Sequence, residues 1–116
     1  MPYIIANDGR REALRSGDTA LTAGELNYQI FFYVKHNSPL SDFKKDVIKG
    51  FVAQFLGEKP NYQKYNDMTG ALVRCYAEIK RRLNIDAEYL IDLLASYNEE
   101  IDKYEDIKIQ ENGDVE

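Results

Sequence analysis

Helix-start and helix-stop residues divide the chain into segments, and this punctuation constrains the fold more than any other feature. Thr22 is followed three residues later by Glu25, which is the spacing of a capping box at a helix N-terminus. Ser41 gives a second start signal. Gly57 and Pro60 give a strong stop, because glycine adopts the left-handed conformation and proline cannot continue a helix. Apolar residues recur at helical spacing between these signals, so the sequence predicts an all-α, compact bundle of four to five helices.

The predicted helices form a single domain over residues 1–116. They span residues 10–15, 22 to about 35, 41–56, 61–83 and 86 to about 104. The third has apolar residues on more than one face and is predicted to be the most buried. Asn61 and the later pair Asn66–Asp67 are alternative starts of the fourth helix. No glycine or proline separates the last two helices, so one continuous long helix is the competing interpretation.

The tail that follows the last predicted helix alternates apolar and polar residues. Ile107, Lys108 and Ile109 fit a short strand that pairs with Tyr3–Ile5, and the alternative is a frayed tail. The sequence therefore leaves open whether the two termini pair as short strands beside the helical bundle.

The charge balance and the few reactive residues argue against several classes of function. The 116 residues include 15 Lys and Arg against 20 Asp and Glu, and the net charge of −5 disfavours bulk nucleic acid and anionic membranes as partners. Cys75 has no cysteine partner in the chain, so we expect a buried thiol in a reducing compartment. No stretch approaches the roughly 20 apolar residues that span a bilayer. We expect a cytoplasmic protein without a membrane partner.

Motifs for catalysis are missing from the sequence, and a magnesium site is the one enzyme alternative. There is no Gly-rich phosphate loop, no nucleophile elbow and no pair of His or Cys residues. All-α nucleotide pyrophosphohydrolases hold Mg²⁺ with carboxylates on neighbouring helices. The candidates for such a site are Asp67, Glu78, Glu99 and Asp102. A solvated acidic helix face is the simpler interpretation, so the leading hypothesis has no catalytic residue, no metal and no cofactor.

A cationic run occupies the last turn of the fourth predicted helix, at Lys80, Arg81 and Arg82. Cations at a helix C-terminus complement the helix dipole, which explains them without a ligand. As a ligand site they suit a phosphate beside a flat ring, because guanidinium groups match phosphate and tyrosines stack on bases.

A further set of short segments stands out by its order along the chain. The segments are Met1–Ile4, Gly24-Glu25-Leu26-Asn27-Tyr28, Asn66-Asp67-x-x-Gly70-Ala71-Leu72, Arg81-Arg82, Tyr104-Glu105-Asp106 and Glu111-Asn112-Gly113-Asp114. Together they resemble a family of small proteins of unknown function from bacteriophages and prokaryotes. Residues 36–50 and 84–103 look like extra length beside that family, and Lys103 stands where a proline is usual. The resemblance implies a helical protein of viral or prokaryotic origin and supplies no activity.

The resemblance also nominates polar residues that the hydrophobic pattern does not require. With the two arginines they form the predicted ligand-binding set: Asn27, Tyr28, Asn66, Arg81, Arg82 and Tyr104. Asn66 has a structural explanation as a helix cap. Asn27 lies inside a predicted helix, where asparagine is a poor helix former and usually needs a hydrogen-bonding reason.

The leading hypothesis is a non-enzymatic, small oligomeric binding protein of phage type. Its ligand would be a nucleotide-derived signal of host defence, sequestered in the host cytoplasm by tyrosine stacking and by the arginines. Self-association is expected through the last two helices, because nine tyrosines exceed what a small core needs. The alternatives are a Mg²⁺-dependent nucleotide hydrolase and a pure protein-interaction module.

Overall fold

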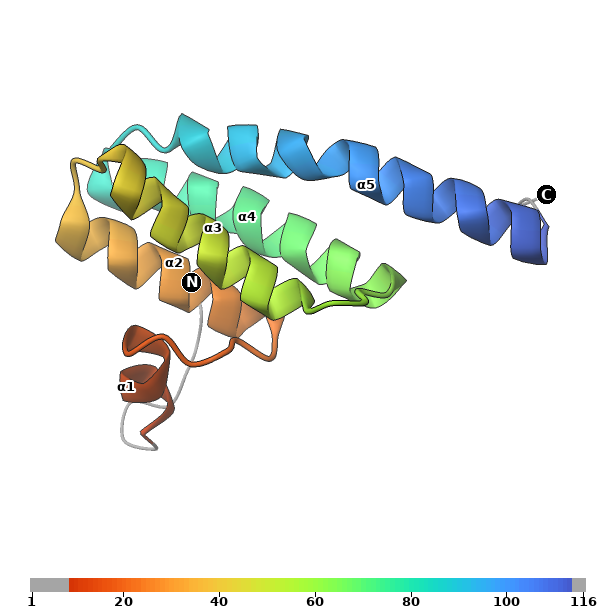
Figure 1. The fold of residues 1–116 in the computed structure, drawn as a ribbon. Coiled ribbons are helices and arrows are strands. Elements are labelled where there is room, and N and C mark those ends of the chain that lie inside the picture. Colours follow the sequence, from red (N-terminus) through yellow and green to blue (C-terminus); the bar gives the residue numbers. More distant parts are fainter. Residues whose placement is uncertain (1–8, 114–116) are drawn as a thin grey trace.

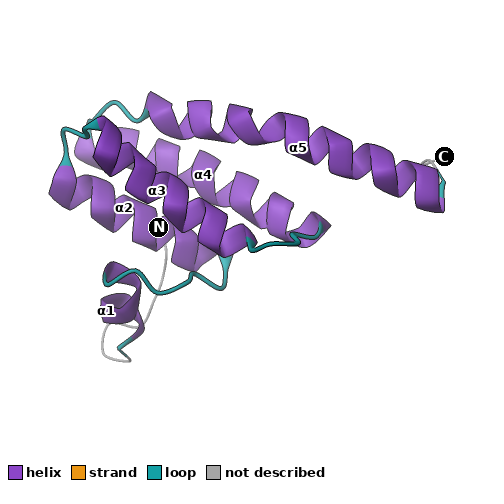
Figure 2. Cartoon of the chain, in the orientation of Figure 1, coloured by secondary structure: helices purple, strands orange, loops and turns teal. Residues whose placement is uncertain are grey.

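The computed structural model describes residues 9–113, and the regular structure of this part of the chain is helical throughout (Figures 1 and 2). The helices are α1 (Arg10–Arg15), α2 (Ala23–Asn37), α3 (Asp42–Leu56), α4 (Tyr62–Leu83) and α5 (Glu88–Asn112). From α2 to α5, successive helices run in opposite directions, and α1 lies on the outer side of α2 (Figure 1). The predicted all-α bundle is confirmed. None of the five described helices combines the length and the hydrophobicity needed to cross a membrane.

Side-chain caps explain where three of the helices begin. Thr22, Ser41 and Asn61 each accept a hydrogen bond from the backbone N–H three residues later. The first two starts were predicted and are confirmed. Asn61 is the cap of α4, so the alternative start at Asn66–Asp67 is wrong: these residues lie inside the helix, because the earlier cap already begins it.

The chain turns back between α4 and α5 at residues 84–87 (Figure 1). Asn84 ends α4 in the left-handed conformation, with a φ of 53°. Asp86 Oδ1 then accepts a hydrogen bond from the backbone nitrogen of Glu88 at 3.0 Å, and α5 begins at Glu88. The interpretation of one continuous helix is therefore wrong. Asparagine tolerates the left-handed conformation, so it ends a helix without a glycine.

Helix α5 continues beyond its predicted end at Tyr104. It runs to Asn112, and Gly113 follows it with a φ of 86°. Residues 107–109 are helical, so the predicted strand there is wrong, and its expected partner, residues 3–5, lies outside the described part of the chain. The short alternation is embedded in good helix formers with no break before Gly113, and a helix that is already formed extends readily.

The core lies mainly between α2 and α4, which contact each other more extensively than any other pair of described helices. Each of these two helices has seven buried residues, whereas α3 has four, so the prediction that α3 is the most buried helix is wrong. One face of α3 packs on α2 and α4, and Phe43 on another face is 77% exposed. Cys75 is fully buried, as expected, and burial raises the pKa of its thiol.

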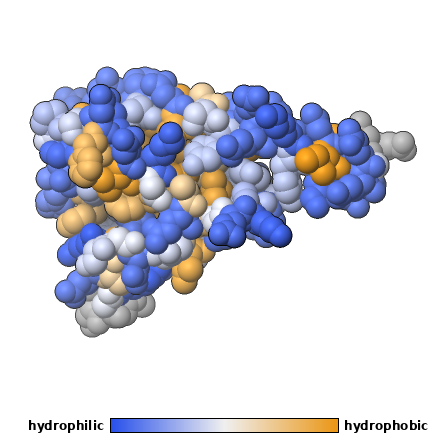
Figure 3. All heavy atoms as spheres, viewed as in Figure 1, coloured by the Kyte–Doolittle hydropathy of each residue, from blue (hydrophilic) through white to orange (hydrophobic). Residues whose placement is uncertain are grey.

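The last part of α5 projects beyond the other helices (Figure 1). Every residue from 105 to 113 is exposed. In the space-filling view, apolar atoms at this projecting end are surrounded by hydrophilic ones (Figure 3). Among residues 9–113, this end of α5 is therefore not covered by another helix.

Candidate functional site

Two of the nominated ligand residues, Asn27 and Tyr28 on α2, are buried, with 5% and 7% of their surfaces exposed. The Tyr28 hydroxyl accepts a hydrogen bond from Arg15 Nε at 2.8 Å. The Arg11 guanidinium lies 5.6 Å from the centre of the Tyr28 ring, within the range of a cation–π interaction. Tyr28 therefore attaches α1 to α2, which is a structural role that the sequence did not reveal.

The other four nominated residues lie at different ends of the bundle. Asn66 is near the beginning of α4, and Arg81 and Arg82 are in its last turn, about 22 Å further along the axis. Tyr104 lies on α5, with its ring 5.5 Å from that of Tyr65 on α4, so it is close to the Asn66 end. The six nominated residues thus divide among three places and do not form one site.

The four carboxylates of the magnesium alternative are also apart. Asp67 and Glu78 lie about 16 Å apart along the axis of α4, and Glu99 and Asp102 are exposed on α5. Glu78 Oε2 accepts a hydrogen bond from Arg81 Nη2 at 2.8 Å, and this bond lowers the pKa of Glu78. Within residues 9–113, no three His, Cys, Asp or Glu side chains gather in a way that could hold a metal ion.

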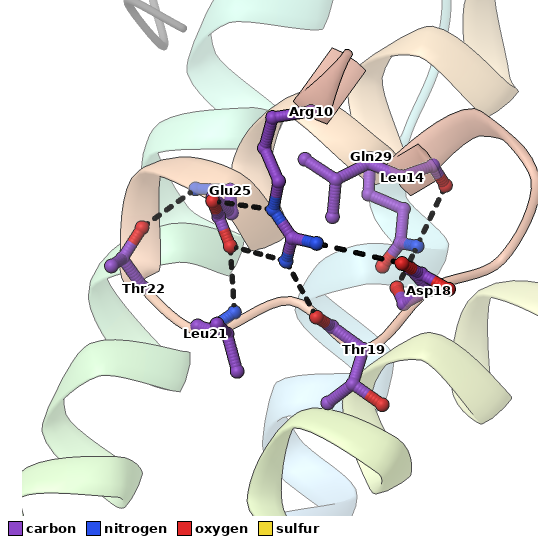
Figure 4. A network of polar contacts seen from close by, with 8 residues as sticks. All are labelled: Arg10, Leu14, Asp18, Thr19, Leu21, Thr22, Glu25 and Gln29. Carbon is purple, nitrogen blue, oxygen red and sulfur yellow. Dashed lines mark hydrogen bonds and ion pairs between the residues drawn. The ribbon is translucent and has the colours of Figure 1, made fainter. Parts of the chain in front are cut away.

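A network of polar contacts joins α1 and the loop after it to α2 (Figure 4). Arg10 donates from Nε and Nη2 to the two carboxylate oxygens of Glu25, at 2.8 and 2.7 Å. Glu25 also accepts from the backbone nitrogen of Leu21 at 2.9 Å, one residue before the cap at Thr22. The hydrogen bond from Arg10 is the largest of the effects that lower the pKa of Glu25. The capping-box carboxylate thus also holds α1.

The second part of this network is the side chain of Gln29, which is buried beneath α1. Its Nε2 donates to the carbonyl oxygens of Leu14 and Asp18, at 2.9 and 2.8 Å. These carbonyls belong to the end of α1 and to the following loop, where backbone acceptors lack helical partners. The docking of α1 therefore explains Glu25, Tyr28 and Gln29, but it does not explain Asn27, whose side-chain oxygen Oδ1 is buried without a hydrogen-bond partner among the described residues.

A hollow of about 460 Å³ lies where α5 extends past the beginning of α4. Tyr62 of α4 lines it on one side, and α5 lines it on the other with residues that include Tyr104, Glu105, Lys108 and Ile109. Tyr62 is 56% exposed and Ile109 is 41% exposed. We use the name α5-end surface for the apolar residues at this hollow together with the carboxylates beside Ile109. These residues are Tyr62, Asp102, Tyr104, Glu105, Asp106 and Ile109.

The α5-end surface carries more negative than positive charge, since it has three carboxylates and, of the described residues, only Lys108 lines the hollow as a cation. Asp102, Glu105 and Asp106 lie seven, four and three residues before Ile109, which places all three on its side of the helix. None of them forms an ion pair with another described residue. The nearby Lys108 pairs instead with Glu111, at 3.5 Å. The surface therefore combines an apolar centre with a negative rim.

A second hollow, of about 340 Å³, lies between α3 and α5. Tyr89 of α5 lines it together with Lys45 of α3, whose Nζ lies 5.7 Å from the centre of the Tyr89 ring. The Tyr89 hydroxyl oxygen is buried and has no hydrogen-bond partner. Burial raises the pKa of this hydroxyl, because the charged phenolate is poorly solvated there.

Sequence reasoning nominated Tyr104 but missed Tyr62 and Ile109 as surface residues. The alternating pattern around Ile109 favours a short strand or a frayed tail, and no motif in the sequence marks Tyr62 as a surface residue. The missing break between residues 104 and 112 was the available signal, because a continuous helix puts Glu105 and Ile109 one turn apart on the same face. Helix α5 extends beyond the beginning of α4 because of how the two helices pack, and no local sequence signal indicates this extension.

No family model matches this chain, and neither a curated protein nor a solved structure matches it. The resemblance to a phage and prokaryotic family stays a prediction.

Proposed function

We propose that the protein is a non-enzymatic interaction module that binds another protein through the α5-end surface. The observation that carries this proposal is the hollow between Tyr62 and Ile109, at a helix end with no tertiary packing of its own. Single exposed apolar residues are ordinary on protein surfaces. Here the exposed Tyr62 and Ile109 flank one concave place with the half-buried Tyr104, which is typical of an interaction site.

The other two functional hypotheses have less support. Sequestration of a nucleotide-derived ligand needs stacking and phosphate-binding groups in one place, whereas Tyr28 is buried and Arg81 lies far from Asn66. The magnesium-dependent hydrolase needs carboxylates that converge, and Asp67 and Glu78 are about 16 Å apart along α4.

Self-association is the form of interaction that the tyrosine content predicts, and light scattering tests it directly. A dimer mass at high micromolar concentration, reduced to a monomer mass by Ile109→Ser, would support association through the α5-end surface. A monomer mass throughout would contradict self-association and would leave a different protein as the partner.

Site-specific photo-cross-linking tests the interaction surface itself. A benzophenone amino acid replaces Ile109 in one variant and Val73, an exposed residue on α4, in the control. We expect an adduct of defined mass from position 109 in cells and none from position 73. Adducts of equal yield from both positions, or none from position 109, would contradict the proposed surface.

A further inference from the structure

We infer that the partner of the α5-end surface is a positively charged amphipathic helix of another protein. This inference rests on the proposed function and adds the chemistry of the partner. It follows from three properties of the surface, which are its excess of negative charge, the effect of that charge on self-association, and the fact that helices form its described part.

The first property is the negative rim around an apolar centre. Asp102, Glu105 and Asp106 form no ion pair within the described chain, because Lys103 pairs with Glu99 and Lys108 pairs with Glu111. Lysine or arginine side chains of a partner would meet these carboxylates, while apolar partner residues enter the hollow beside Ile109. Complementary charge of this kind speeds association and selects the partner.

The second property is the repulsion between two copies. A symmetric dimer places the same patch of both subunits face to face. Such a contact through the α5-end surface would bring Asp102, Glu105 and Asp106 of one copy near the same carboxylates of the other. Like charges that meet across an interface are destabilising, so the surface favours a cationic partner over a second copy.

The third property is the form of the surface, which is made of side chains. The backbone groups of α5 are bonded within the helix, so this described part of the surface offers no sheet edge to which a strand could add. A groove of side chains instead suits an amphipathic helix that inserts residues three, four and seven positions apart. The hollow between Tyr62 and Ile109 is the place for one such inserted residue.

A synthetic peptide gives a direct test. The probe is a fluorescent helix of about 18 residues with leucine on one face and lysine on the other, and the comparison peptide has glutamate in place of lysine. We expect the lysine peptide to bind the full chain more tightly than the glutamate peptide in fluorescence anisotropy. Its affinity should fall as salt is added, because salt screens exposed charges.

Matched variants locate the binding. Ile109→Ser should weaken the binding of the lysine peptide about tenfold. Burial of an isoleucine side chain contributes a free energy that corresponds to a change in affinity of about that size. Ile107→Ser is its control: Ile107 is also exposed, but it points to the opposite side of α5 and should leave the affinity within about twofold. Circular dichroism checks that both variants keep their helices.

A second pair of variants separates local charge from net charge. Glu105→Lys and Asp92→Lys change the net charge equally, but Asp92 lies about 20 Å earlier along α5. We expect Glu105→Lys to reduce the affinity for the lysine peptide about fivefold more than Asp92→Lys does. Equal losses, or equal binding of the glutamate peptide, would overturn the inference of a cationic partner. Absence of peptide binding, or a dimer that Ile109→Ser dissociates, would also overturn it. The proposed function fails separately, when position 109 gives no cross-linked adduct.

Discussion

Arg10 and Glu25 join α1 to α2 through two charge-assisted hydrogen bonds, at 2.8 and 2.7 Å. Both side chains are largely shielded from solvent, with 24% and 16% of their surfaces exposed. We expect Glu25→Gln to lower the free energy of unfolding by about 1–2 kcal/mol, because a hydrogen bond between two charged groups is stronger than one between neutral groups. Urea denaturation measures this change. Glu12→Gln on the exposed side of α1 is the control and should change stability by less than about 0.5 kcal/mol.

The same pair gives the protein a pH dependence of known sign. The hydrogen bond from Arg10 lowers the pKa of Glu25 from its ordinary value of 4.5. The carboxylate therefore stabilises the fold above about pH 4.5, and this contribution is lost as the pH falls through the lower pKa of the folded state. The stability difference between the wild type and Glu25→Gln should be constant from pH 7 to 5 and should shrink below pH 4.5. A difference that persists to pH 3 would show that the charge of Glu25 is not its source.

Replacing Tyr89 by phenylalanine should stabilise the protein. The Tyr89 hydroxyl is buried without a hydrogen-bond partner, so its removal ends a desolvation penalty at little cost in packing. We expect a gain of about 0.5–1.5 kcal/mol in the free energy of unfolding. Thermal unfolding of Tyr89→Phe beside Tyr62→Phe, whose ring is exposed, measures it. A loss of stability in Tyr89→Phe would indicate that the hydroxyl has a partner in solution.

Leu72 and Val73 are neighbours in sequence and differ in burial, which makes them a matched test of the core. Leu72 is fully buried between the packed helices, whereas Val73 is exposed on α4. We expect Leu72→Ala to reduce the free energy of unfolding by about 2–5 kcal/mol, through lost burial and a residual cavity. Val73→Ala should change it by less than about 0.5 kcal/mol. Similar effects at both positions in urea denaturation would contradict the assigned orientation of α4.

The helix starts could be predicted where a single side chain determines them. Thr22 and Ser41 cap their helices through hydrogen bonds that span three residues, so the local sequence contains the whole signal. The end of α4 also has a local cause, because asparagine tolerates the left-handed conformation that Asn84 adopts there. The end of α5 could not be predicted in this way, because Ile107 and Ile109 fit an alternating pattern as well as a helix, and the choice depends on the length of helix already formed before them.

The candidate site was harder to predict because burial depends on how helices meet. Tyr28 was expected to face a ligand, yet it is covered when α1 docks on α2, and Arg15, which bonds its hydroxyl, is 13 residues away in the sequence. Tyr62 has no local sequence signal of a surface role, yet it is exposed at the hollow beside the projecting part of α5. Periodicity identifies an apolar face, but it does not tell which part of that face another helix covers.

The projecting end of α5 has a consequence for local unfolding. Its amide hydrogens are held only by bonds within the helix, since residues 105–113 are exposed and bury nothing against the core. Segments of this kind open with a small free energy, well below that of global unfolding. Hydrogen exchange should therefore be slow around Leu72, which is fully buried in the middle of α4, and fast beyond Glu105. A bound partner would slow exchange at these last turns without altering exchange in the core. This helix end is therefore expected to unfold and refold independently of the core.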